Sequence, residues 1–205
     1  MLEKLIVFVE EISMEVALNK LLPKILGEVA FQIIQFQCKN DLLKQLPSRL
    51  KGYSTWLPAG HTIMVLVDRD RDDCLQLKQQ LEQMATEAGL VTKTQDTERF
   101  QVVNRVVIEE LESWFFGDWP AVRQAYPRVP ENIPRRAKYR NPDEISGGTW
   151  EALEREMKNV GYFSTGINKL ECAREIGQHM NPTLNNSPSF NAFVAAINAA
   201  LAESS

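Results

Sequence analysis

Cysteine and histidine are scarce in this sequence, with three Cys and two His among 205 residues. Cys38, Cys74 and Cys172 are widely spaced and form no CxxC pair, so neither a disulfide framework nor a zinc site is predicted. Such cysteine usage favours the reducing environment of the cytoplasm. His61 and His179 have no Ser or Cys partner in a recognisable motif, and this argues against a nucleophilic triad.

Long apolar runs and glycine-rich phosphate loops are also missing. No apolar run approaches the ~20 residues that a membrane span needs. The opening MLEKLIVFVEE lacks a basic n-region and a small-residue cleavage site, so no signal peptide is predicted. There is no GxxxxGK[ST] and no GxGxxG, which excludes the familiar nucleotide-binding loops. The net charge of −4 argues against a purely electrostatic nucleic-acid binder, but it is compatible with an enzyme that meets phosphates through metal ions.

The first half of the chain alternates strand-like and helix-like segments. This pattern predicts an α/β fold, with a mostly parallel sheet flanked by helices over residues 1–116. A mainly helical C-terminal extension over residues 117–205 is expected to pack on this domain. A helix capped by Ser13 and a second helix broken near Pro47 are expected in the first part. Strands are expected at residues 5–9, 29–37, 62–67, 90–95 and 99–110, and later helices at residues 149–160 and 168–180, before a closing helix capped by Ser187 or Ser189.

Four aspartates follow the apolar run in HTIMVLVDRDRDDC: Asp68, Asp70, Asp72 and Asp73. Asp72 and Asp73 are explained by the start of the next helix, where an acid gains about 0.3–1 kcal/mol from the helix dipole. Asp68 and Asp70 lie earlier, where the strand ends. Their Asp-x-Asp spacing presents two carboxylates to one divalent cation, and Mg²⁺ prefers such oxygen ligands.

Further acids follow two other predicted strands. Glu10 and Glu11 come directly after the first strand, and because adjacent residues of an extended chain point opposite ways, one of them, preferably Glu10, is expected to face a cleft. Glu109, Glu110 and Glu112 follow a later strand, and they either join the site or form the polar face of a helix start. Ligands bind at the carboxyl ends of parallel strands, so the acidic clusters are expected to converge there.

These motifs carry a resemblance to known families. VFVEE and VLVDRDRDD resemble the Toprim fold of topoisomerases, primases and OLD-type nucleases, which is Rossmann-like and has a glutamate after the first strand and DxD after the third. That resemblance covers about residues 1–110. Over nearly its full length the chain is similar to a bacterial family, domain of unknown function 4276, through VEEISMEVALNKLLPKIL, VLVDRDRDDC, VIEELESWFFGD, YRNPDEI and NNSPSFNAF.

The resemblance implies a nuclease that uses Mg²⁺ or Mn²⁺ and acts on DNA or RNA. Glu10 (or Glu11), Asp68 and Asp70 would hold the metal, and the ions would activate water and neutralise the charge that develops on the phosphate. The Toprim glutamate is commonly followed by Gly, whereas Glu11 stands there in this chain. Some members of the broad group are encoded beside ATPases of the kind used in phage defence, which implies an ATPase partner. The assisting residues would be Glu110 or Glu112, and Lys169.

A basic segment, RRAKYR, lies in the second half of the chain. Arg135, Arg136, Lys138 and Arg140 either contact a phosphate backbone, with Tyr139 stacking on a base, or form a solvated loop.

Two other functions remain open. One is a non-catalytic regulatory or partner-binding subunit that retains the fold, and the other is a receiver-like phosphoacceptor. The receiver would use Asp68 as the acceptor and needs a lysine at the end of a late strand, which the sequence does not offer.

Overall fold

Four of the short apolar segments pair as neighbouring parallel strands. The computed structural model describes residues 1–202 and contains one four-stranded sheet, all parallel, in the order β2-β1-β3-β4. The strands are β1 (Lys4–Val9), β2 (Ala30–Gln35), β3 (His61–Asp68) and β4 (Val102–Val107). Together with its flanking helices the sheet makes a mixed α/β fold, consistent with a Rossmann-like or Toprim-like arrangement, as the alternating pattern predicts.

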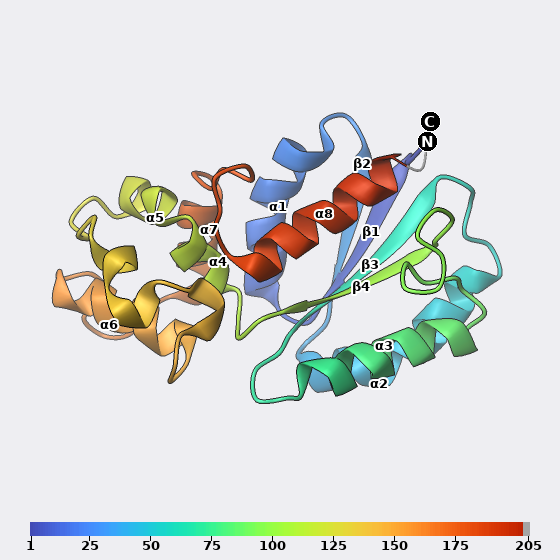
Figure 1. Cartoon of the computed structure of the whole chain (residues 1–205), viewed down its shortest axis with the longest axis horizontal. Helices are drawn as coiled ribbons and strands as arrows, with labels where there is room; N and C mark the ends of the chain where they lie inside the picture. The colour runs from blue at the N-terminus through green and yellow to red at the C-terminus, as the bar shows by residue number, and fades with distance from the viewer. Residues whose placement is uncertain (203–205) are drawn as a thin grey trace.

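Helices cover both faces of this sheet, as Figure 1 shows. Side chains alternate along a strand, so Leu5, Val7 and Val9 of β1 pack with α1 (Ile12–Leu26) and α8 (Pro188–Ala202). Ile6 and Phe8 point the other way, toward α2 (Lys39–Ser54) and α3 (Cys74–Glu87). This double burial explains why the two central strands, β1 and β3, are continuous apolar runs rather than alternating ones.

Helix α2 runs through Pro47 without interruption, so the predicted break there is wrong. Leu42, Leu46 and Leu50 recur at helical spacing and are fully buried against the sheet, while Pro47 is exposed. The packing of that leucine face outweighs the one backbone hydrogen bond that proline removes.

Two further local expectations are also wrong. Ser13 is not the cap of α1, because the helix begins at Ile12 with Glu11 in the N-cap position. Residues 90–95 form a single bridge, from Thr92 to Val102, rather than a strand. The Thr92 carbonyl accepts from the backbone N–H groups of Gln95 and Asp96, which closes a turn instead.

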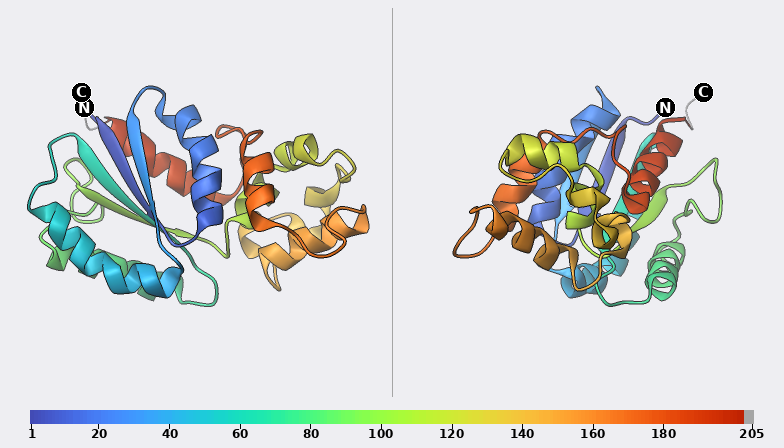
Figure 2. Two further views of the ribbon diagram at one scale, coloured as in Figure 1. Left: turned by 180° about the vertical axis from the view of Figure 1, so that it is seen from behind. Right: turned by 60° about the vertical axis from the view of Figure 1, so that its left-hand side comes forward.

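The second half of the chain lies beyond the carboxyl ends of the strands, and only its last helix returns along the sheet, beside α1 (Figures 1 and 2). Ser187, not Ser189, caps α8, since its Oγ accepts from the Phe190 N–H at 3.2 Å. Among residues 1–202 no helix has both the length and the apolarity needed to cross a membrane. The helices are α4 (Glu112–Gly117), α5 (Trp119–Ala125), α6 (Thr149–Asn159) and α7 (Lys169–Gly177), with 3-10 turns at Ile133–Arg135, Ala137–Tyr139 and Pro142–Glu144.

Candidate functional site

The strand order places two acidic residues side by side. Glu10 directly follows β1, and Asp68 is the last residue of β3, the strand that pairs with β1. The chain leaves β1 toward β2 on one side, then returns to β3 on the other. Ligands of open α/β sheets bind at such a switch point, outside the carboxyl ends of the strands.

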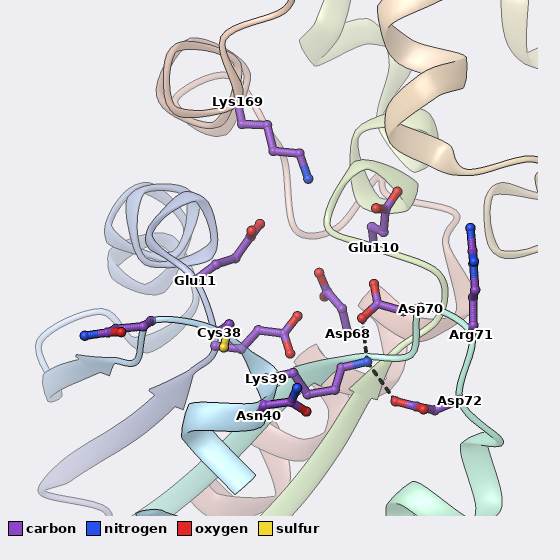
Figure 3. Close-up of a pocket in the computed structure, with 12 residues that line it drawn as sticks. Glu11, Cys38, Lys39, Asn40, Asp68, Asp70, Arg71, Asp72, Glu110 and Lys169 are labelled. Atoms are coloured by element: carbon purple, nitrogen blue, oxygen red, sulfur yellow. Dashed lines mark hydrogen bonds and ion pairs between the residues drawn. The ribbon is translucent and has the colours of Figure 1, made fainter. Parts of the chain in front are cut away.

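A cavity of about 550 Å³ opens at this point (Figure 3). It gathers side chains from both halves of the chain. The sequence-predicted residues that line it are Glu10, Glu11, Asp68, Asp70, Glu110 and Lys169, and the others are Gln37, Cys38, Lys39, Asn40, Arg71 and Asp72.

Glu10 and Asp68 are both buried, with 7% and 3% of their surface exposed. Glu10 Oε2 and Asp68 Oδ1 have no hydrogen-bond partner. Burial raises the pKa of Glu10 to about 7 against the opposing charge of Lys39. Burial also raises the pKa of Asp68 well above its ordinary value, and the Glu10 carboxylate adds to that shift. Two neighbouring buried carboxylates with unused oxygens are unfavourable unless a cation compensates them.

Lys39 supplies part of that positive charge, and sequence reasoning missed it. Its Nζ lies 2.5 Å from Asp70 Oδ2 and 2.9 Å from Asp72 Oδ2, and it donates to the Arg69 carbonyl at 3.1 Å. Burial lowers the pKa of Lys39, but its bonds to the two aspartates outweigh burial and raise the pKa overall. The available signal was position, because Lys39 begins α2 just after β2 and therefore lies at the same sheet edge.

The three predicted metal ligands thus line one cavity, but their carboxylates are not arranged around a common point. Glu10 and Asp68 offer free oxygens, whereas Asp70 is turned toward Lys39. With the side chains in these positions, no group of three or more His, Cys, Asp and Glu residues within residues 1–202 is arranged to hold a metal ion. The donor set itself, carboxylate oxygens alone, is of the kind that hard divalent cations prefer.

The loop that carries Asp70 is held in an uncommon backbone conformation. Asp70 has φ 50° and Glu109 has φ 62°, both in the left-handed region. The Asp70 N–H donates to the Glu109 carbonyl at 3.1 Å, and the Arg69 guanidinium pairs with the Glu109 carboxylate. Glu109 therefore anchors this loop from the end of β4, and non-glycine residues in such conformations cluster at functional sites.

The other two glutamates after β4 have different surroundings. Glu110 Oε2 accepts from Thr149 Oγ1 and from the Trp150 N–H, both at 3.0 Å, and so ties the cavity rim to the start of α6. Glu112 is only 1% exposed, its Oε2 lacks a partner, and it is not among the residues that line the cavity. Burial raises the pKa of Glu112 to about 7, against the charge of Lys169.

Lys169 enters the cavity from the C-terminal half of the chain. It is the first residue of α7, and Figure 3 shows it across the carboxylates from Lys39. Burial lowers the pKa of Lys169, but the charges of Glu112, Glu11 and other carboxylates together raise it. Its Nζ also lies over the ring of Trp150, 4.7 Å from the centroid.

A known family covers nearly the whole chain. The family described as Domain of unknown function (DUF4276) matches residues 9–198. The chain belongs to the DUF4276 family. Searches among curated proteins and among solved structures give no match. The family description names no activity, so the function of this DUF4276 chain has to be argued from the site itself.

The basic segment of this DUF4276 chain lies apart from the cavity lining. Arg136 and Lys138 contact the Glu156 carboxylate at 2.9 and 3.4 Å, and Arg140 is exposed. Of the two alternatives for this segment, neither describes Tyr139, which is not open to a base or to solvent. Tyr139 is 1% exposed, stacks on Phe116 and donates to Glu156 Oε1 at 2.7 Å. Arg135 lines a separate cavity beside Trp119.

Helix ends add positive potential to the acidic cavity. Helices α1, α2 and α7 all begin at it, through Glu11, Cys38 and Lys169 respectively. No side chain caps the first turn of α1 or α2 by a hydrogen bond. The N-terminus of a helix carries positive partial charge and favours anions. Unused carboxylate oxygens next to lysines and helix N-termini suit the joint binding of a divalent cation and a phosphate group.

Proposed function

We propose that this protein is a nuclease of the reducing cytoplasm that depends on Mg²⁺ or Mn²⁺ and hydrolyses phosphodiester bonds of DNA or RNA. One observation carries the proposal. Glu10 and Asp68 lie at the carboxyl ends of adjacent strands, are buried, and each keep a carboxylate oxygen without a hydrogen-bond partner. Buried polar atoms are normally paired, and unpaired ones at a sheet edge built for ligands call for a missing ligand.

Glu10, Asp68 and Asp70 are the residues that would hold the ion. Glu10 fits better than Glu11, because Glu11 is half-exposed and already accepts from Ser13 Oγ, whereas Glu10 Oε2 is buried and unpaired. Asp70 joins them by exchanging its contact with Lys39 for the ion. When bound, such an ion neutralises charge on the phosphate and makes water a better nucleophile at neutral pH.

The remaining residues of the cavity serve the phosphate. Lys169 faces the carboxylates from the opposite side of the cavity. A phosphate placed between Lys169 and the carboxylates would lie next to the lysine's positive charge. Lys39, freed from Asp70, stays within the site through Asp72 and the Arg69 carbonyl. Glu110 fixes the rim by holding the first turn of α6. Preorganised cations of this kind stabilise the charge that develops during phosphoryl transfer.

The deciding experiment is titration calorimetry with Mg²⁺ and Mn²⁺. Asp68→Asn/Asp70→Asn is the test variant. Asp73→Asn is the matched control, since Asp73 caps α3 through the Gln76 N–H and asparagine caps a helix equally well. Wild type and Asp73→Asn should bind the ions at millimolar concentration or tighter, and the double variant should not.

Cleavage assays on DNA and RNA follow with the same three proteins. Asp68→Asn alone should abolish cleavage while the metal-free melting temperature stays unchanged or rises, because one source of repulsion is removed. Equal ion binding by all three proteins, or none by any while all are folded, would refute the metal site and leave the regulatory-subunit interpretation in its place.

A further inference from the structure

One of the four tryptophans is neither part of the core nor fully exposed. Trp114 and Trp119 are buried in the larger core cluster. Trp56, at the opposite end of the sheet, is 60% exposed and packs against Tyr53 with the two rings tilted. Trp150 is half-buried and belongs to neither of the two buried clusters. An indole that is left partly open to solvent without serving the core needs another explanation.

Trp150 lies at the rim of the acidic cavity through two separate contacts. It is the second residue of α6, and its backbone N–H donates to Glu110 Oε2 at 3.0 Å. Its ring lies under Lys169 Nζ, 4.7 Å from the centroid. Glu110 and Lys169 both line the cavity. An aromatic ring therefore stands next to the lysine to which the proposed phosphate site is assigned.

The contact with Lys169 alone does not account for this ring. The carboxylates of Glu112, Glu11 and Glu110 already favour the charged form of Lys169, since they raise its pKa against the effect of burial. An indole is not needed for that purpose. Through Lys169 the ring lies next to the cavity lining, although Trp150 is not itself one of the lining residues. An aromatic face at this place is the feature that a nucleobase, rather than a phosphate or a metal ion, would use.

We propose that Trp150 forms a nucleobase subsite, in which the indole stacks on the base of a nucleotide whose phosphate lies in the acidic cavity. This inference rests on the proposed function for the placement of the phosphate. Stacking on an aromatic ring needs a base with an open face, so the subsite selects single-stranded or unpaired nucleic acid over a continuous duplex. It tolerates any base, because every base has a π-face.

A thermodynamic cycle between the indole and the base tests the subsite. Fluorescence anisotropy would measure the binding of a labelled single-stranded oligonucleotide and of the same strand with abasic residues, with Ca²⁺ in place of Mg²⁺ to limit cleavage. Trp150→Ala should weaken binding of the normal strand by roughly ten-fold, within the range for one base stacked on an aromatic ring. The same substitution should leave the binding of the abasic strand, which is already weaker, unchanged.

Two further variants control this cycle. Trp150→Phe keeps an aromatic ring and should retain most of the affinity, and it serves as the test if Trp150→Ala lowers the melting temperature. Trp56→Ala removes the exposed indole at the other end of the sheet and should change neither strand. The bond to Glu110 uses the Trp150 backbone, so these substitutions leave it in place.

Several results would overturn the subsite. One is that Trp150→Ala weakens the binding of the normal and the abasic strand equally, and another is that the wild-type protein binds neither strand. A third is that Trp150→Ala leaves binding unchanged but slows cleavage, which would mean that Trp150 only positions Lys169. The nuclease proposal is tested separately. If the effect of Trp150→Ala depends on the presence of the base but no hydrolysis occurs, the subsite stands and the catalytic proposal is refuted. If hydrolysis occurs but the effect does not depend on the base, the catalytic proposal stands and the subsite is refuted.

Discussion

Three buried carboxylates, those of Glu10, Asp68 and Glu112, each retain an oxygen without a hydrogen-bond partner. Burial penalises the charged form, so the pKa of each is raised. The folded protein therefore holds protons that the unfolded chain releases, and its stability must fall as the pH rises through that range. Ionisation of these carboxyl groups without a bound cation therefore destabilises the folded protein.

Glu112 offers the cleanest test of this dependence. Its pKa is raised by burial from 4.5 to about 7, so its contribution to stability is complete below 4.5 and is lost as the pH rises through 7. The loss approaches about 3 kcal/mol, at 1.36 kcal/mol for each unit of pKa. In wild type, the free energy of unfolding measured in urea should fall between pH 5 and pH 8. Glu112→Gln, which is neutral and of equal shape, should make that fall less steep.

The control for this prediction is the exposed Glu28. Glu28→Gln should leave the pH profile of the unfolding free energy as it is in wild type. A Glu112→Gln protein with the full wild-type slope would show that other groups, such as Glu10 and Asp68, account for the whole pH dependence.

The residues of the site could be predicted only where strand position determines them. Glu10 and Asp68 were found because both follow apolar strands, and parallel strands end at one edge. Lys39 was missed because its local sequence resembles an ordinary helix start, and its contact with Asp70 joins the start of α2 to the loop after β3. Tyr139 was misjudged because its burial depends on Phe116 and Glu156, which no local pattern reveals.

Among the secondary-structure elements, the short helix α4 depends on a close backbone approach. Gly117 ends α4, and a Cβ at this position would lie 2.1 Å from Asn185 Oδ1 and 2.9 Å from Ser187 Cβ. The same turn is bonded to α4, since Asn185 Nδ2 donates to the Trp114 carbonyl at 2.8 Å. Only glycine lets α4 and this turn approach so closely.

Gly117→Ala should therefore destabilise the protein. The cost of such overpacking is about 1–3 kcal/mol, measured as the free energy of unfolding in urea. Gly52→Ala is the matched control, because Gly52 lies inside α2 and a Cβ added there would have nothing within 4 Å. Gly52→Ala should stabilise by about 0.5–1 kcal/mol. Similar effects of both substitutions would mean that the turn moves aside without cost.

The periodic elements were predictable, and the exceptions have physical causes. The strands follow from short continuous apolar runs, and the long helices follow from apolar residues three to four positions apart. The helix break predicted at Pro47 was wrong because leucines on the opposite face hold α2 together. The strand predicted at residues 90–95 was wrong because Thr92 and Gln95 use their hydrogen bonds in a local turn. Side-chain competition of this kind is invisible to an apolar pattern.

For the whole molecule, the two halves of the chain share one core. The larger buried cluster includes Leu5 and Val7 of the sheet together with Ile176 and Phe193 of the C-terminal extension. The candidate site is shared as well, since Lys169 comes from the second half. The boundary between residues 116 and 117 remains a prediction about the chain, but the packing joins both sides. The sequence predicted an extension packed on the sheet domain, but it did not show which residues form the shared core, because the contacts link residues far apart.

A shared core predicts that both halves unfold together. Phe193 of α8 is fully buried, and its ring centroid lies 5.0 Å from that of Trp114. Phe193→Ala should cost about 3–5 kcal/mol. It should shift thermal unfolding to lower temperature equally in far-UV circular dichroism, which follows all the helices, and in tryptophan fluorescence. Leu184→Ala, at an exposed position, should change neither signal. If the fluorescence transition moved alone, the helical extension would unfold separately from the sheet, and a site that needs Lys169 beside Asp68 would be lost before the sheet itself melts.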